Sequence, residues 1–275
     1  MTEIKKTNNS LDNVNKPIAA VNAKSSTSAL FQFIESLQAP NEWGSFLDAG
    51  TGVNSAQWCS SLQTTKWVGV TGAKDYAKQI EQSLGDSLRP QDELLVGNWG
   101  DKNFLQNQSF DTVLADYLLG AIEGFAPYFQ GKLFARLYPH VKKTLYVIGL
   151  DPYINAPVAT EAGRIVREIG RMRDVCLLLA DQSPYREFPA EWTLNSLNAA
   201  GFKITEARRF PNRYREKWVN SQLDMCVRRL PLFKDKALAK SFATTIEALR
   251  HNGLALCREE NGLRYGADYV IACEV

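Results

Sequence analysis

Short apolar runs alternate along the chain with segments in which apolar residues recur every three or four positions. The runs predict strands at about 45–48, 66–71, 93–97, 110–115, 144–150, 202–207 and 268–275. The periodic segments predict helices at about 28–38, 54–62, 73–84, 133–138, 161–180, 189–200 and 235–258. Because the runs are continuous rather than alternating, both faces of each strand are expected to be buried, which is typical of a parallel sheet covered by helices.

This order of strands and helices predicts a doubly wound α/β fold. In such a fold the ligand binds beyond the carboxyl ends of the parallel strands. The polar residues that end or follow the expected strands should therefore share one crevice. These residues are Asp48, Thr71, Asn98 to Asp101, Asp116 and Asp151.

The polar start of the chain differs from the rest. Residues 1–26 are rich in Lys, Asn, Ser and Thr and hold few large apolar side chains. Such a segment buries too little surface to offset the entropy of ordering, so we expect a flexible tail. No repeat and no linker rich in Gly or Ser divides residues 27–275, which predicts a single domain.

Composition excludes several classes of protein. The chain has 32 Lys and Arg against 30 Asp and Glu, so its net charge of +2 favours neither nucleic acid nor an anionic membrane as a partner. Five cysteines without a C-x-x-C pair predict reduced thiols in an intracellular, cytoplasmic protein. The two histidines are far apart, so no histidine metal site is expected. No apolar run is long enough to span a bilayer.

The segment Asp48-x-Gly50-x-Gly52 carries the strongest functional signal. It follows the first expected strand and leads into a helix, so its glycines allow a tight turn and a close approach of a ligand to the backbone. The unpaired N–H groups of the helix start would then face a polar ligand. Ser55 stands where a dinucleotide-binding fingerprint has its third glycine, which disfavours a pyrophosphate ligand.

Four motifs, taken in order, resemble those of the class I S-adenosylmethionine-dependent methyltransferases. The first is the turn at 48–52. The others are Phe-Asp-Thr-Val-Leu-Ala-Asp at 110–116, Leu-Tyr-Pro at 137–139 with the apolar run at 145–149, and Ala-Ala-Gly-Phe at 199–202. The resemblance covers about 28–210 and the last strand. It implies a seven-stranded, mostly parallel sheet whose last strand is antiparallel.

The resemblance also implies a set of cofactor contacts. Backbone N–H groups of the turn suit the carboxylate of the methionine part, and Asp48 suits its amino group. Thr71 takes the place of the acid with which the family holds the ribose, Asn98 or Asp101 is expected near the adenine, and Trp99 is expected to stack on it. The full set of expected cofactor-binding residues is Asp48, Gly50, Thr51, Gly52, Thr71, Asn98, Trp99 and Asp101.

Catalysis and acceptor binding are expected after later strands. Asp116 and Tyr117 follow the fourth strand, where acceptor and cofactor meet in the family, and Asp116 is the expected base where one is needed. Candidate substrate-binding residues follow the fifth strand or lie in the basic stretch 208–217. They are Asp151, Tyr153, Arg209 and Arg213.

These features predict a methyltransferase that uses S-adenosyl-L-methionine and acts on a small-molecule methyl acceptor. RNA and protein remain alternative acceptors. Insertions at about 151–201 and 208–268 are expected to form a helical cap over the acceptor pocket. The alternative functions are a non-catalytic interaction protein that keeps the cofactor fold and an NAD(P)-dependent oxidoreductase.

Overall fold

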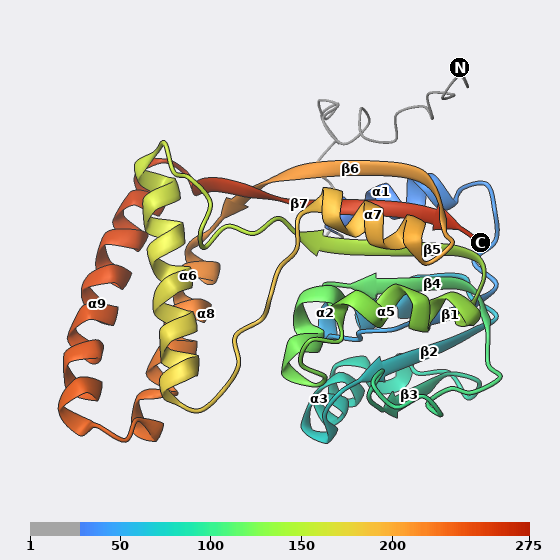
Figure 1. The fold of residues 1–275 in the computed structure, drawn as a ribbon, viewed down its shortest axis with the longest axis horizontal. Coiled ribbons are helices and arrows are strands. Elements are labelled where there is room, and N and C mark those ends of the chain that lie inside the picture. The colour runs from blue at the N-terminus through green and yellow to red at the C-terminus, as the bar shows by residue number, and fades with distance from the viewer. Residues whose placement is uncertain (1–27) are drawn as a thin grey trace, which may run out of the picture. The chain divides into compact units, whose positions relative to one another are not determined.

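Two compact units make up the described part of the chain. The computed structural model describes residues 28–275, and the tail expected over 1–26 lies outside them. The first unit contains the described residues up to Gly149 together with Phe188–Phe210 and Tyr269–Val275, and the second contains Leu150–Glu187 and Pro211–Asp268. The first unit therefore holds most of the sheet, and the second is mainly helical (Figure 1).

The sheet has seven strands in the order β3-β2-β1-β4-β5-β7-β6. The strands are β1 (Ser45–Asp48), β2 (Lys66–Thr71), β3 (Glu93–Val96), β4 (Phe110–Asp116), β5 (Val141–Leu150), β6 (Lys203–Tyr214) and β7 (Leu263–Glu274). The first five are parallel to one another. β7 runs against β5, since Leu145 lies beside Cys273 and Gly149 beside Tyr269.

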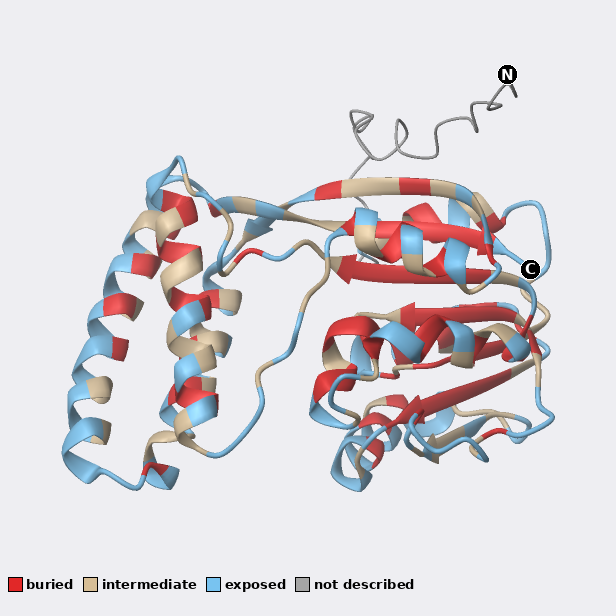
Figure 2. Ribbon diagram, viewed as in Figure 1, coloured by how far each residue is buried: buried red, intermediate tan, exposed pale blue. Residues whose placement is uncertain are grey.

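Helices of the first unit cover both faces of its sheet. The helices are α1 (Ala29–Gln38), α2 (Val53–Ser61), α3 (Lys74–Leu84), α4 (Leu118–Ala121), α5 (Gln130–Leu137) and α7 (Ala190–Ala199). Alternate strand residues enter two separate apolar cores: Leu47 packs with side chains of α5 and α7, and its neighbour Phe46 packs with those of α1, α2 and α3. Figure 2 shows the buried strands between these layers. The predicted doubly wound, seven-stranded fold with an antiparallel last strand is confirmed.

Three long helices form the core of the second unit: α6 (Glu161–Leu179), α8 (Glu216–Val227) and α9 (Lys236–Glu259). Thr160 caps α6 by accepting a hydrogen bond from the Gly163 N–H at 3.1 Å, as its position predicts. This unit is shorter than the insertions expected at 151–201 and 208–268. The difference arises because α7 packs Leu194 and Leu197 into the core of the first unit.

Helix α8 is absent from the elements expected from the sequence, which place no helix between 200 and 235. β6 continues to Tyr214, and α8 begins directly after Arg215. The signal was present, because Val219, Leu223 and Cys226 recur at helical spacing and are all buried.

Two further expectations concern the whole described chain. All five cysteines are buried and free, as predicted. Among residues 28–275, no helix combines the length and the apolar character that crossing a bilayer requires.

Candidate functional site

The turn between β1 and α2 is fixed to both strands beside β1. Thr51 donates its hydroxyl to the Asp48 carbonyl at 2.9 Å and accepts the Val70 N–H of β2 at 2.8 Å. Its own N–H donates to the Val70 carbonyl at 2.7 Å, and the Ala49 N–H donates to the Leu114 carbonyl of β4 at 2.8 Å. The turn is therefore rigid before any ligand binds.

The two glycines of this turn have different structural roles. A Cβ on Gly50 would lie 3.0 Å from the Leu118 Cβ, so Gly50 lets the turn pack closely on α4. A Cβ on Gly52 would meet nothing within 4 Å. Gly52 precedes the first residue of α2, and Ser55 accepts its N–H at 3.0 Å, while the next N–H groups at the helix start have no intrahelical partner. The turn thus presents open backbone donors at a helix N-terminus.

Asp48 ends β1 with a fully buried side chain. Neither oxygen of its carboxylate has a hydrogen-bond partner in the part of the chain that the structure describes. Burial raises the pKa of Asp48 to about 6, while Ser55, the Gly50 N–H and Thr51 lie close enough to lower it somewhat without reaching hydrogen-bond geometry. This carboxylate is therefore poised to accept hydrogen bonds from a ligand.

A second acid, Asp116, lies near Asp48 at the end of β4. Burial, followed by the charges of Asp48 and Asp116, raises the pKa of Cys59 well above its usual value. Both acids are thus close to one thiol of α2. Tyr117, the next residue, has φ of 48° and ψ of 16°, a left-handed conformation that is strained for a bulky side chain and often occurs at functional sites.

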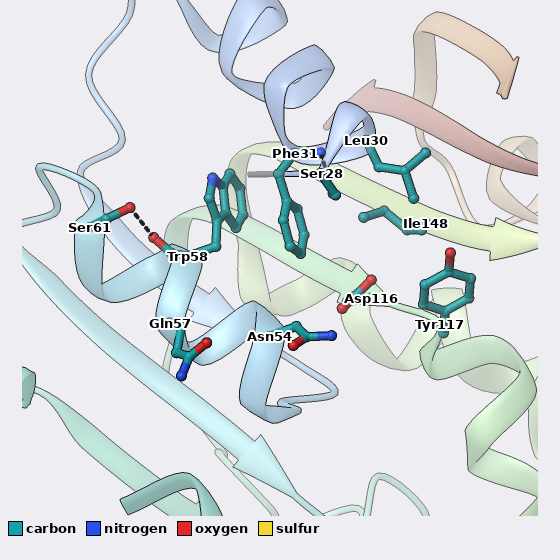
Figure 3. A pocket seen from close by; sticks show the side chains of 10 residues that line it. All are labelled: Ser28, Leu30, Phe31, Asn54, Gln57, Trp58, Ser61, Asp116, Tyr117 and Ile148. Atoms are coloured by element: carbon teal, nitrogen blue, oxygen red, sulfur yellow. Dashed lines mark hydrogen bonds between the residues drawn. The ribbon is translucent and has the colours of Figure 1, made fainter. Parts of the chain in front are cut away.

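Asp116 and Tyr117 line a pocket of about 530 Å³ within the first unit (Figure 3). Its lining includes Phe31 of α1 and Trp58 of α2, whose rings stack with centroids 4.3 Å apart. Asn54 faces Asp116 across the pocket in Figure 3. The complete lining is Ser28, Leu30, Phe31, Asn54, Gln57, Trp58, Ser61, Asp116, Tyr117 and Ile148. The pocket therefore combines apolar surface with a few polar groups, as small-molecule sites do.

Trp99 supports the turn from inside the core. Its side chain is only 3% exposed, and its indole N–H donates to the Ala49 carbonyl at 2.7 Å. Its ring packs against Phe104 at 5.5 Å, and the Arg136 guanidinium lies over the ring at 5.5 Å. These contacts correct the expectation that Trp99 stacks on an adenine, because burial leaves no open ring face.

Thr71 and the segment after β3 meet at the same edge of the sheet. Thr71 is buried, and its carbonyl accepts the Gly97 N–H at 3.0 Å. The Asn98 amide donates to the Phe125 carbonyl at 2.7 Å, and its oxygen accepts the Gly100 N–H at 2.9 Å. Both polar atoms of Asn98 therefore hold the local backbone.

Phe125, which the sequence analysis did not single out, lies over the backbone that follows β2. A Cβ on Gly72 would come within 2.5 Å of the Phe125 ring, and 37% of Phe125 is exposed. Asp101 accepts the Asn103 N–H at 2.9 Å and so stabilises a turn. The aromatic group available at this edge is consequently Phe125 rather than Trp99.

The candidate substrate residues fall in different places. Arg209, in the first unit, donates from Nη2 to both carboxylate oxygens of Glu191 at 2.6 and 2.7 Å. This ion pair ties β6 to α7. Asp151, in the second unit, is half-buried and donates its N–H to the Ala267 carbonyl at 3.0 Å. Arg213 is exposed in the second unit.

Tyr153 is part of the core of the second unit. It is 3% exposed, and its hydroxyl accepts from Arg173 Nη1 at 3.0 Å. The Nε and Nη2 atoms of Arg173 also donate to Asp174 Oδ1 at 2.9 and 2.7 Å, and Nη1 reaches Gln222 Oε1 at 3.2 Å. Burial raises the pKa of the Tyr153 hydroxyl. The structure thus gives Tyr153 a packing and hydrogen-bonding role, which corrects its expected contact with a substrate.

Comparisons with known proteins concern the fold. Searches with protein-family models and against curated protein sequences find no match. Among solved structures, a Bacillus halodurans protein assigned as a methyltransferase is similar at 15% identity and a TM-score of 0.56, over 90% of this chain and 98% of that one.

Two further solved structures resemble the chain. Mycolic acid cyclopropane synthase CmaA1, complexed with SAH and CTAB, has 16% identity and a TM-score of 0.50 over 88% of this chain and 84% of that one. The [4+2]-cyclase SpnF has 12% identity and a TM-score of 0.52, over 89% and 79%. At such identities the likeness establishes the methyltransferase-like fold.

Proposed function

We propose that the chain is an S-adenosylmethionine-dependent methyltransferase that acts on a small-molecule acceptor. The observation that carries the proposal is the buried Asp48 carboxylate, which has no hydrogen-bond partner among residues 28–275 and lies at an open glycine turn. A buried acid without a donor destabilises the fold, so this arrangement favours a ligand that brings the donor. The amino group of the methionine part of the cofactor is such a donor.

The other proposed contacts are with the methionine carboxylate at one end of the cofactor and with the ribose and adenine at the other end. The N–H groups at the start of α2 suit the methionine carboxylate, and Gly52 leaves the approach to them open. At the ends of β2 and β3, Thr71 offers a hydroxyl for the ribose. Asn98 holds the backbone of Phe125, whose exposed ring offers a surface for the adenine.

Methyl transfer needs little covalent chemistry from the protein. When bound, S-adenosylmethionine supplies a methyl group on a positively charged sulfur, which the acceptor nucleophile displaces in line. The pocket beside Asp116 and Tyr117 orients the acceptor, and this positioning supplies most of the rate enhancement. Asp116 takes the proton of an acceptor that must lose one.

The pocket also supports the choice of acceptor class. Its volume of about 530 Å³ lies within the range of about 300–1,000 Å³ that is typical of small-molecule sites. The stacked pair Phe31 and Trp58 offers an apolar surface, and Asn54 and Gln57 offer hydrogen bonds. We therefore place a small acceptor with an apolar part here, ahead of RNA or protein.

An oxidoreductase is disfavoured by two features. Ser55, which replaces the third glycine, is fully buried against the turn. In the sheet, β7 lies between β5 and β6, whereas the dinucleotide-binding order continues directly from the fifth to the sixth strand.

Calorimetric titration of the full chain separates the candidate functions. S-adenosylmethionine and S-adenosylhomocysteine are each expected to bind with a stoichiometry of one, and NADH is expected to give no saturable heat. Binding of NADH alone would support the oxidoreductase. An absence of binding by all three would contradict both enzymatic functions.

A further inference from the structure

Three arginines gather where β6 ends and β7 begins, in the second unit. Arg213 lies near the end of β6, Arg215 precedes α8, and Arg264 lies near the start of β7, the neighbouring strand. Gly262, which has a φ of +108°, directly precedes β7. Its backbone lies so close to Arg213 that a Cβ on Gly262 would be 2.9 Å from the Arg213 Cγ. Residues about fifty apart in the sequence thus form one group, which we call the arginine cluster.

No ion pair within residues 28–275 neutralises the arginine cluster. The side chains of Arg213 and Arg264 form neither an ion pair nor a hydrogen bond with any residue of this range. Within the described part of the chain, the Arg215 side chain donates only to Asn261, whose carbonyl lies 2.7 Å from Nη1. The acid next along the chain, Glu216, pairs with Arg258 at 3.0 Å.

The like charges of the cluster affect Arg213 most directly. Desolvation and the like charges of Arg264 and Arg215 lower the pKa of the Arg213 guanidinium. Like charges on neighbouring strands destabilise a sheet, so this grouping has a cost in the absence of an anion.

Other arginines of the same unit behave differently. Arg164 pairs with Glu161 and Glu168, and Arg250 pairs with Asp224 at 2.8 Å and Glu247 at 3.3 Å. Unlike Arg164 and Arg250, the arginines of the cluster have no acidic partner among residues 28–275, and Arg213 and Arg264 lie on neighbouring strands.

A helix N-terminus adds to the positive field of the cluster. Arg215 is the residue before α8, a helix of 12 residues, and its side chain does not cap the first N–H groups of the helix. These groups favour an anion, and guanidinium groups match the oxygens of a phosphate with paired hydrogen bonds. We propose that the arginine cluster binds a single phosphate or diphosphate group carried by a small ligand.

The size and surroundings of the cluster favour this ligand over two larger partners. A protein that binds a nucleic-acid backbone tightly makes on the order of 6–10 phosphate contacts, which three arginines do not supply. No large apolar side chain is exposed at 211–217 or 261–266, so the cluster lacks the apolar contacts that strengthen binding to a lipid surface. The proposal concerns the second unit alone and does not depend on the proposed methyl transfer.

The test compares the full chain with Arg213→Gln, Arg264→Gln and the control Arg228→Gln, which changes another exposed arginine of the same unit. Pyrophosphate, inorganic phosphate and chloride are compared at equal ionic strength by calorimetry and by thermal unfolding. We expect pyrophosphate to bind the wild-type chain and to raise its unfolding midpoint more than chloride does. Either cluster substitution should weaken binding about tenfold or more, and Arg228→Gln should leave it unchanged.

A second readout follows from the repulsion. At low ionic strength without phosphate, Arg213→Gln and Arg264→Gln should be at least as stable as the wild type, since each removes a like-charge contact. Equal stabilisation by chloride and pyrophosphate, or unchanged pyrophosphate binding in both variants, would overturn the proposal. Binding of phosphatidylserine vesicles or a 20-nucleotide RNA in place of pyrophosphate would overturn it in favour of a membrane or nucleic-acid surface.

Discussion

Replacing Asp48 with asparagine is expected to stabilise the unliganded protein while removing most of its affinity for S-adenosylmethionine. Burial raises the pKa of Asp48 from 3.8 to about 6, so ionisation of this group opposes folding. The folded state binds the proton more tightly than the unfolded state, and stability is therefore lost as the pH rises from about 4 to about 6. The full penalty, about 3 kcal/mol, applies above pH 6, and the neutral amide avoids part of it.

The loss of affinity has a separate cause. Asparagine keeps the shape of the side chain but cannot offer two anionic oxygens to the amino group of the cofactor. Urea unfolding at pH 5 and pH 8 measures the stability change, which should be about half as large at pH 5 as at pH 8. Titration with S-adenosylhomocysteine at pH 8 measures the affinity.

Asp111→Asn is the matched control at the opposite end of β4. Its carboxylate accepts from the Ser45 N–H at 3.0 Å and the Ser45 hydroxyl at 2.6 Å, and pairs with Lys143 at 3.1 Å. These partners hold the pKa of Asp111 well below its usual range, so Asp111→Asn should destabilise the chain at pH 8 and leave cofactor affinity unchanged. Destabilisation by Asp48→Asn at pH 8, or unchanged affinity, would contradict the role given to Asp48.

Replacing Arg173 with leucine is expected to destabilise the second unit by about 3–5 kcal/mol. Its guanidinium is largely buried and donates to Tyr153, Asp174 and Gln222. Leucine would leave these acceptors without their donor, and the nearby Glu187, whose pKa burial raises to about 7, would lose a compensating charge. Denaturant unfolding of the wild-type and variant proteins measures this loss of stability.

Arg164→Leu on the same helix serves as the control for Arg173→Leu. Arg164 forms exposed ion pairs with Glu161 and Glu168, which are screened by water and stabilise little. We expect near-wild-type unfolding for this variant. Equal effects of the two substitutions would show that the buried network does not stabilise the unit.

Local spacing was enough to predict the sheet and its ligand turn. The order of the strands and the glycine turn follow from residues close together in the sequence, whereas the antiparallel last strand was implied by the family resemblance. The predicted strands at 202–207 and 268–275 were too short, because β6 continues to Tyr214 and β7 begins at Leu263. Asp48 was assigned to the site on the same grounds, and the structure adds that its carboxylate is buried without a partner among the described residues. The spacing of residues in the sequence could place Asp48 at the turn. It could not show that the buried carboxylate lacks a hydrogen-bond donor.

The remaining site residues depend on contacts between distant segments. Trp99 follows β3 as a ligand-facing residue would, yet its indole is buried in the core, where its N–H donates to the Ala49 carbonyl. Phe125 lies in a segment without apolar periodicity, so no local sequence pattern indicated that it belongs to the site. Arg213 was predicted to bind substrate from the basic stretch alone, whereas its neighbour Arg264 comes from the far end of the chain.

The most direct test of the account is the number of protons released when S-adenosylhomocysteine binds. With a pKa of about 6, Asp48 is about half protonated at pH 6 in the free protein, and the incoming amino group should drive off that proton. Calorimetry at pH 6 in two buffers of different ionisation enthalpy should therefore show release of about half a proton per ligand, and Asp48→Asn should abolish this release. Binding without proton release, or release that persists in Asp48→Asn, would contradict the assignment of Asp48 as the group that receives the cofactor.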